Sequence, residues 1–158
     1  MDNISTNNSQ ISNWDISAIE KCFSLHLIPM IFGDTVFDTL KGGTILSTED
    51  IFLHLCRLMK EPPRILLAGL EEGVWSDFPK REKLIDVFFS DQNETDEFIQ
   101  GSVFTDVTGG MSEKVRLMKN IIESGNAHSA VIFSGETEGN TENALTGKNV
   151  GTLIRKQE

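Results

Sequence analysis

Two adjacent glycines followed by a lysine give this sequence its clearest chemical signal. In the stretch Asp106-Val107-Thr108-Gly109-Gly110-Met111, the glycines let the backbone approach a ligand closely, and Lys114 follows about one helical turn later. A helix starting here would present unpaired N–H groups and the positive end of its dipole to a phosphate. The same residue types also occur where a loop leads into an ordinary amphipathic helix with a solvated lysine. The stretch alone leaves both interpretations open.

The helix that must carry Lys114 is well marked in the sequence. After Gly110, apolar residues recur at helical spacing, and Ser124-Gly125-Asn126 supplies a stop. The residues of this stripe are Met111, Val115, Met118 and Ile122. Lys114 is therefore expected on the first turn of an amphipathic helix.

Helical and extended segments alternate along the rest of the chain. Further helices are expected from residues 14, 48 and 141, and strands are expected at residues 28–32, 44–46, 65–68, 130–133 and 151–154. This alternation predicts an α/β fold with a mainly parallel sheet. The strands at 28–32, 65–68 and 130–133 are expected side by side in one sheet, covered by helices that start near Thr48 and Met111.

Two segments stand outside this pattern. Residues 1–13 lack periodicity and are rich in Asn and Ser, so they are expected to form a disordered tail ahead of a single domain at residues 14–158. Residues 77–101 are charged and irregular, apart from one apolar stretch at 84–89. They are expected to form a peripheral excursion from the fold.

Composition narrows the classes of partner. The 158 residues carry a formal net charge of −10, which argues against nucleic acid or an anionic membrane as a partner. The two cysteines are too few for a disulfide framework and favour a reducing, cytoplasmic location. No hydrophobic run is long enough to span a bilayer.

Several familiar catalytic motifs are absent from the sequence. A Walker-type phosphate loop fails at Gly147-Lys148, because Glu142 stands where its first glycine is required. Cys22 and His26 are four residues apart, but no second pair completes a metal site, so no protein metal ligands are expected. No Gly-x-Ser-x-Gly is present to support a serine hydrolase.

Six stretches follow one another along the chain in an informative order: residues 29–38, 45–50, 73–75, 106–114, 139–147 and 150–154. In this order they resemble the C-terminal half of the isopentenyl phosphate kinases, which belong to the amino acid kinase superfamily. The likeness runs from about residue 14 to residue 154, and Asp-Val-Thr-Gly-Gly-Met followed by lysine is specific within that group. The resemblance implies a three-layer αβα fold whose C-terminal half holds ATP, with Mg²⁺ held mainly through the ATP phosphates.

The resemblance also implies roles for single residues. Gly109, Gly110 and Lys114 match positions at the nucleotide phosphates, and Lys114 would offset charge on the transferred phosphoryl group. Leu70 and Glu72 stand where the family has two aspartates at the nucleotide edge. Thr48 and Glu49 stand where the family usually has Gly-Asp, so Thr48 is expected beside the acceptor and Glu49 is expected to position the lysines.

Some elements of the family have no match in this sequence. Members begin with a strand ending in Lys-x-Gly-Gly-Ser and later carry a histidine that holds the acceptor, and neither matches this sequence. Two hypotheses follow: a kinase half that needs an N-terminal half from upstream or from another chain, or a catalytically inactive nucleotide-binding pseudokinase or interaction remnant. The expected partners are a nucleotide, a small phosphate acceptor, and either a second copy of the chain or that N-terminal half.

Overall fold

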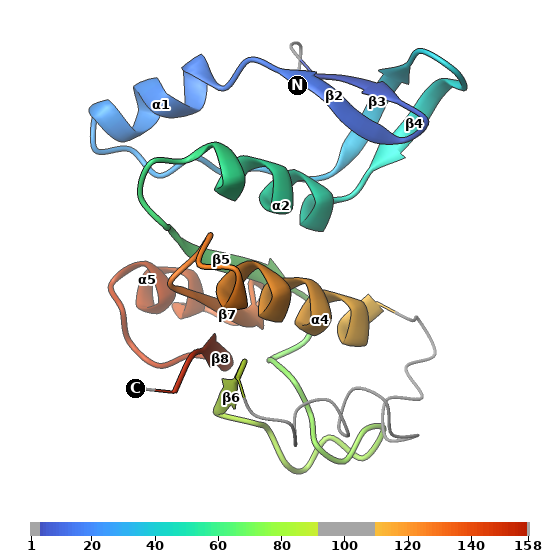
Figure 1. The fold of residues 1–158 in the computed structure, drawn as a ribbon. Helices are drawn as coiled ribbons and strands as arrows, with labels where there is room; N and C mark the ends of the chain where they lie inside the picture. The colour runs from blue at the N-terminus through green and yellow to red at the C-terminus, as the bar shows by residue number, and fades with distance from the viewer. Residues whose placement is uncertain (1–3, 92–109, 158) are drawn as a thin grey trace. The chain divides into compact units, whose positions relative to one another are not determined.

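A computed structural model describes residues 4–91 and 110–157 of the chain (Figure 1). The chain divides into two compact units, residues Met1–Leu58 and Met59–Glu158. Each unit contains a sheet and helices, so the α/β class expected from the sequence is confirmed. The expectation of one sheet is wrong, because the strands form two separate sheets, one in each unit.

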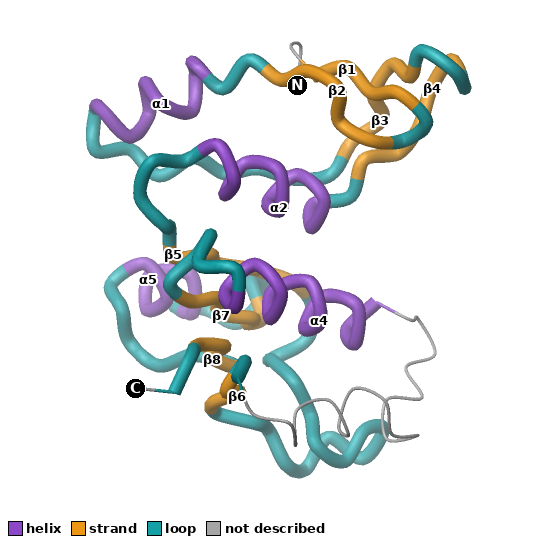
Figure 2. Tube along the Cα trace, viewed as in Figure 1, coloured by secondary structure: helices purple, strands orange, loops and turns teal. Residues whose placement is uncertain are grey.

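The sheet of the first unit has the strand order β2-β1-β3-β4 (Figure 2). Its strands are β1 (Ile4–Asn7), β2 (Gln10–Trp14), β3 (Asp34–Asp38) and β4 (Gly42–Leu46). Strands β1 and β2 are antiparallel, as are β3 and β4, whereas β1 pairs parallel to β3. The unit also contains helices α1 (Ser17–Ser24) and α2 (Thr48–Leu58). The helix expected from residue 48 is therefore confirmed.

The N-terminal residues form a hairpin where a disordered tail was expected. The β1–β2 turn contains Asn8 and Ser9 at φ 51° and 65°, the left-handed conformation of tight hairpin turns. Within β1, Ile4 and Thr6 are buried in alternation with more exposed residues. The expectation was wrong because a short polar strand gains its order from its neighbour β3, which local periodicity does not reveal.

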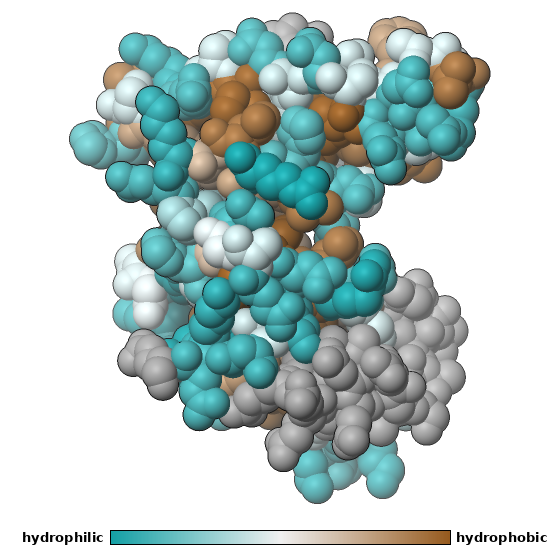
Figure 3. Space-filling model, in the orientation of Figure 1, coloured by the Kyte–Doolittle hydropathy of each residue, from teal (hydrophilic) through white to brown (hydrophobic). Residues whose placement is uncertain are grey.

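Residues 28–32 do not form the expected strand. Ile28 is 69% exposed, Met30 is 88% exposed and Phe32 is 66% exposed, and Figure 3 shows apolar surface on this unit. Of this segment, Ile31 packs against the core cluster of Ile4, Val36, Leu46 and Ile51. The segment has the composition of a strand, but a strand also needs a neighbour for its backbone hydrogen bonds.

The sheet of the second unit has the strand order β5-β7-β8-β6. Its strands are β5 (Arg64–Gly69), β7 (Ser129–Ser134), β8 (Thr152–Arg155) and β6 (Val87–Phe89). The expected parallel pairing of 65–68 with 130–133 is confirmed, with Ile65 opposite Ala130. Strand β6 is also parallel to β8, whereas β7 and β8 are antiparallel. Residues 87–89 thus belong to the main sheet, and the expectation that they were peripheral is wrong.

Helices cover both faces of this second sheet. Figure 1 shows α4 (Gly110–Glu123) in front of the strands and α5 (Asn140–Leu145) behind them. Val131 and Phe133 of β7 pack with Ala144 of α5. The alternate β7 residues Ala130 and Ile132 are buried as well, as expected for a strand covered on two sides. The buried side of α4 includes Val115, Met118 and Ile122, all predicted from the spacing.

A buried threonine ties the loops of this unit to β8. The Thr152 hydroxyl accepts a 2.8 Å hydrogen bond from the Val74 amide and donates a 2.6 Å bond to the Ile85 carbonyl. The neighbouring Gly151 has φ 58°, and a Cβ there would lie 2.7 Å from the Glu72 carbonyl oxygen. Glu72, Val74 and Ile85 are therefore held closely against the start of β8.

Candidate functional site

The first turn of α4 brings together two of the residues predicted to bind phosphate. Gly110 begins the helix, and a Cβ built on it would lie 3.9 Å from Lys114 Nζ. The lysine ammonium therefore lies beside the helix N-terminus, where backbone N–H groups and the helix dipole also favour an anion. Gly109, the other predicted glycine, lies outside the described residues.

An acidic side chain next to Lys114 is held by an arginine of the same helix. Arg116 Nε donates a 2.9 Å hydrogen bond to Glu113 Oε2, and a second Arg116 nitrogen pairs with the other carboxylate oxygen. The hydrogen bond from Arg116 lowers the pKa of Glu113 and outweighs the opposing effect of desolvation. Arg116 thus offsets the negative charge of Glu113 at the start of α4.

The carboxyl ends of β5 and β7 meet at one edge of the sheet. Gly69 lies opposite Ser134, and the Gly135 amide continues the pairing with a 2.8 Å hydrogen bond to the Gly69 carbonyl. Helix α4 packs against β7 and leads into it through residues 124–128, so its first turn lies at this same edge. Ligands bind at this edge in open α/β sheets.

Leu70 and Glu72 follow β5 directly and so belong to this edge. Leu70 is 77% exposed, and Glu72 is also exposed. Glu71 between them is fixed, because it accepts a 2.7 Å bond from Arg81 and a 3.3 Å bond from Trp75 Nε1. The loop therefore leaves Leu70 and Glu72 accessible while Glu71 anchors it.

Thr48 and Glu49 lie in the first unit, on the first turn of α2. The Thr48 hydroxyl accepts a 2.9 Å hydrogen bond from the Gly33 amide, and Glu49 is half-buried. Helix α2 is capped by Ser47, whose Oγ accepts a 3.0 Å hydrogen bond from the Asp50 amide. The sequence correctly predicted where this helix starts. It did not predict that the Thr48 hydroxyl would bind the backbone amide of Gly33, the residue before β3.

Asp38 was not singled out from the sequence, although it organises the first unit. Its carboxylate accepts hydrogen bonds from the Ser9 amide (2.7 Å), the Thr6 hydroxyl (2.9 Å) and the Lys41 amide (2.9 Å). Burial works to raise the pKa of this carboxyl, but these bonds together hold it far below the usual range. In the sequence, Asp38 could be recognised only as an aspartate before a turn, a place where aspartate side chains often bind nearby backbone amides.

Among the described residues, no three His, Cys, Asp or Glu side chains are grouped as they would be to hold a metal ion. In the same part of the chain, no helix has the length and apolar character needed to cross a bilayer.

Comparison with protein families matches residues 2–134 to the amino acid kinase family. The chain belongs to this family. The match includes β1 and β2, which the sequence analysis had assigned to a tail outside the domain. The family assignment stands even though the strands at 65–68 and 130–133 do not share a sheet with residues 28–32, as the sequence analysis had expected them to.

Isopentenyl phosphate kinases are among the family members that this chain resembles. It is 35% identical to the enzyme of Methanothermobacter thermautotrophicus over 92% of this chain and 55% of the relative. It is 33% identical to the Methanocaldococcus jannaschii enzyme over 89% of this chain and 51% of the relative. A solved isopentenyl phosphate kinase matches with a TM-score of 0.68 at 27% identity, covering 97% of this chain and 55% of that structure. This amino acid kinase chain thus spans about half the length of its relatives.

Proposed function

We propose that this chain is the nucleotide-binding part of an ATP-dependent small-molecule phosphate kinase, with isopentenyl phosphate as the acceptor. The observation that carries the proposal is the position of the Lys114 ammonium beside Gly110, at the start of α4 and at the carboxyl edge of β5 and β7. The names of the relatives support the choice of acceptor.

In this proposal, the α4 backbone amides and Lys114 hold the phosphates of ATP. Lys114 offsets the negative charge that spreads over the transferred phosphoryl group, so its contribution is larger in the transition state than with ATP bound at rest. Gly110 leaves room for the phosphates to approach the helix end. Leu70 and Glu72, on the loop after β5, border the rest of the nucleotide.

Mg²⁺ would be held mainly by the ATP phosphates, and when bound it would neutralise part of their charge. The described residues offer a cationic side chain and helix amides, which fit the phosphates of such a complex. Thr48 and Glu49 are proposed on the acceptor side. Glu49 would orient cationic groups around the reacting phosphate.

We further propose that catalysis needs an N-terminal half, from an upstream segment or from another polypeptide. Phosphoryl transfer depends on positioning both substrates in line. The chain spans 55% of the Methanothermobacter relative, which leaves much of that protein without a counterpart. The exposed side chains of Ile28, Met30 and Phe32 would suit packing against such a further segment.

A nucleotide-binding protein without catalytic activity is the second candidate. Its support is the hydrogen bond between Thr48 and Gly33, which engages a side chain where kinases of the resembled group usually carry glycine. Under this alternative, the nucleotide still binds at Gly110 and Lys114. The two candidates therefore differ in turnover and agree on binding.

An ADP-release assay with ATP and isopentenyl phosphate separates the two candidates. The 158-residue chain is assayed alone and after mixing with the N-terminal part of the Methanothermobacter relative. The kinase proposal predicts negligible release by the chain alone and release from the mixture, lost again with Lys114→Ala. If the two polypeptides form a complex that binds nucleotide but releases no ADP, the result would favour the catalytically inactive protein.

A further inference from the structure

The connection from β5 to β6 begins with a short stretch, residues 70–72, whose backbone is fixed on both sides. Before it, Gly69 is still paired with β7. After it, the Val74 amide donates a 2.8 Å hydrogen bond to Thr152 Oγ1, and a Cβ on Gly73 would lie only 2.6 Å from the same oxygen. The three residues between these points form the part of the loop that leaves the carboxyl edge of the sheet.

Glu71, the middle residue of this stretch, joins it to the far part of the loop. Each oxygen of its carboxylate accepts one hydrogen bond. Oε1 accepts a 2.7 Å bond from Arg81, ten residues away, and Oε2 accepts a 3.3 Å bond from Trp75 Nε1, four residues away. We call Glu71, Trp75 and Arg81 the Glu71 clamp. A carboxylate bound on both oxygens has a fixed orientation, so the clamp fixes the backbone that carries it.

The two donors of the clamp are themselves held by the loop. Trp75 forms an antiparallel bridge with Leu84. The Arg81 guanidinium lies over the Phe78 ring, with 5.5 Å between its Cζ and the ring centroid. The Asp77 carboxylate accepts bonds of 3.2 and 3.1 Å from the two amides that follow Arg81. The clamp therefore joins residues 70–72 to a folded segment.

The clamp acts on one side of the proposed nucleotide site. Leu70 and Glu72, the neighbours of Glu71, are both exposed and are proposed to border the nucleoside part of ATP. Gly110 and Lys114 are proposed to hold the phosphates. Exposed loop residues lose conformational freedom when a ligand binds, and this loss costs affinity unless the loop is already held in place. The clamp supplies that hold for the nucleoside side alone.

We propose that Glu71 is a positioning residue that makes the site select a nucleoside triphosphate over an inorganic polyphosphate. Through Trp75 and Arg81 it keeps residues 70–72 in the form that receives the nucleoside. The clamp does not need to touch the ligand, because its effect is on the loop that does. This inference rests on the proposed function, since it assumes that ATP binds at this edge of the sheet.

The test is a calorimetric titration of the full chain with two ligands, ATP and inorganic tripolyphosphate, which has the three phosphates without the nucleoside. Glu71→Ala should weaken ATP binding about fivefold, the factor that corresponds to about 1 kcal/mol for an exposed ion pair. It should not weaken tripolyphosphate binding, which also shows that the variant is folded. Loss of a carboxylate would by charge alone favour both anions, so weaker ATP binding has the opposite sign to that effect. Lys114→Ala should weaken both ligands.

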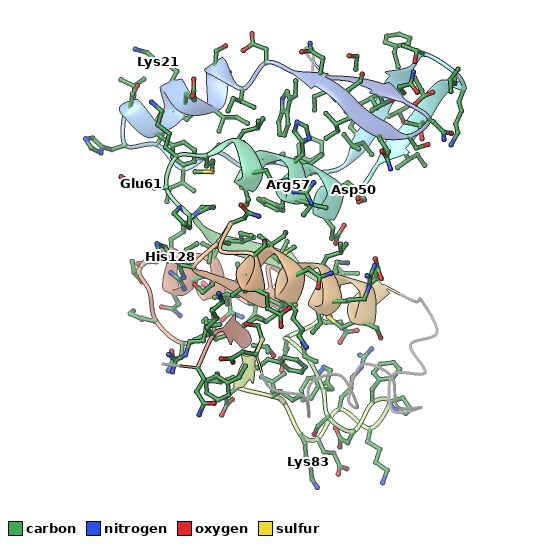
Figure 4. The ribbon with its side chains drawn as sticks, viewed as in Figure 1. Lys21, Asp50, Arg57, Glu61, Lys83 and His128 are labelled. Carbon is green, nitrogen blue, oxygen red and sulfur yellow. The ribbon has the colours of Figure 1, made fainter. Side chains whose placement is uncertain are left out.

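Glu82→Ala is the matched control. It removes the same charge from the same exposed loop, next to Lys83, which Figure 4 labels. It should change ATP affinity by less than about twofold. An equal loss of ATP affinity in the two variants, or an equal loss for both ligands in Glu71→Ala, would overturn the inference. Failure of the parent chain to bind ATP would instead overturn the proposed function, and this inference with it.

The clamp can also be observed without any ligand. The chain has two tryptophans, so its NMR spectrum contains two indole N–H signals. Glu71→Ala should shift the signal of Trp75, which loses its acceptor, and leave that of Trp14 in the first unit unchanged. An unchanged Trp75 signal would show that the clamp does not form in solution and would overturn the inference, whether or not ATP binds.

Discussion

The backbone amide of Gly33 donates a 2.9 Å hydrogen bond to the hydroxyl of Thr48. This bond ties the residue before β3 to the first turn of α2. The approach is close, because a Cβ on Gly33 would lie only 2.7 Å from the Leu46 carbonyl oxygen. The threonine at the position predicted for acceptor binding therefore has a structural contact of its own.

Thr48→Val should destabilise the first unit by about 1–2 kcal/mol. It removes the acceptor and leaves the partly buried Gly33 amide without its partner. Thr48→Ser keeps the hydroxyl and should cost less. Urea unfolding measures the difference, and hydrogen exchange at the Gly33 amide should be faster in the valine variant alone. Equal exchange in both variants would show that the bond does not form in solution.

Gly151→Ala should destabilise the second unit by more than about 2 kcal/mol. Its φ is 58°, and the new Cβ would clash with the Ile132 carbonyl and lie 2.7 Å from the Glu72 carbonyl oxygen. Gly147→Ala is the matched control, because Gly147 has φ 83° but open space around it. The control should cost only about 1 kcal/mol, the backbone penalty alone. Similar unfolding midpoints for the two variants would contradict this packing.

The sequence predicted best the elements whose patterns are local. Helix α4 follows from apolar spacing and a glycine start, and α2 follows from Ser47 and two acids before an apolar stripe. The pairing of β5 with β7 also followed, because both strands are continuous apolar runs and a helix was expected between them. For the candidate site, Gly110 and Lys114 were predicted together and lie together.

The remaining features depend on contacts between distant residues. Strand β1 is ordered because it pairs with β3. The Thr6 hydroxyl donates its hydrogen bond to Asp38, which is 32 residues away in the sequence. Residues 28–32 show the opposite case, since apolar composition predicted a strand where no strand forms. Strand β6 was missed because only three residues pair, with β8 near the end of the chain. No local pattern carries this information.

Asp38 should make the first unit sensitive to acid. The bonds from Ser9, Lys41 and Thr6 lower its folded pKa, so its stabilising effect is present above the unfolded pKa of about 3.9. That effect is lost as the pH falls below this value toward the folded pKa. Asp38→Asn should lower the unfolding midpoint at pH 7 and flatten its dependence on pH below about 4. Urea unfolding over a pH series provides the measurement, followed by the fluorescence of Trp14 in a Trp75→Phe background that leaves one tryptophan. Parallel pH curves for parent and variant would contradict this role.

The two cysteines should react at different rates with a thiol reagent. Cys56 is buried on α2, and burial raises the pKa of its thiol to about 11, so little thiolate is present at pH 8. Cys22 on α1 is only half-buried. One thiol should therefore react rapidly in the native chain and the second only after unfolding. Cys22→Ser should abolish the rapid phase, and rapid reaction of both thiols in the folded parent would contradict the burial of Cys56.

Calorimetric titration of the 158-residue chain with ATP tests the central claim most directly. If the start of α4 holds the ATP phosphates, Lys114→Ala should weaken ATP binding about 10- to 100-fold, as expected for loss of a charge-assisted bond of about 1.5–3 kcal/mol. Lys83→Ala, which removes an exposed charge from the same unit, should leave the affinity nearly unchanged. Equal ATP affinity for the parent and Lys114→Ala would contradict a nucleotide site at Gly110 and Lys114.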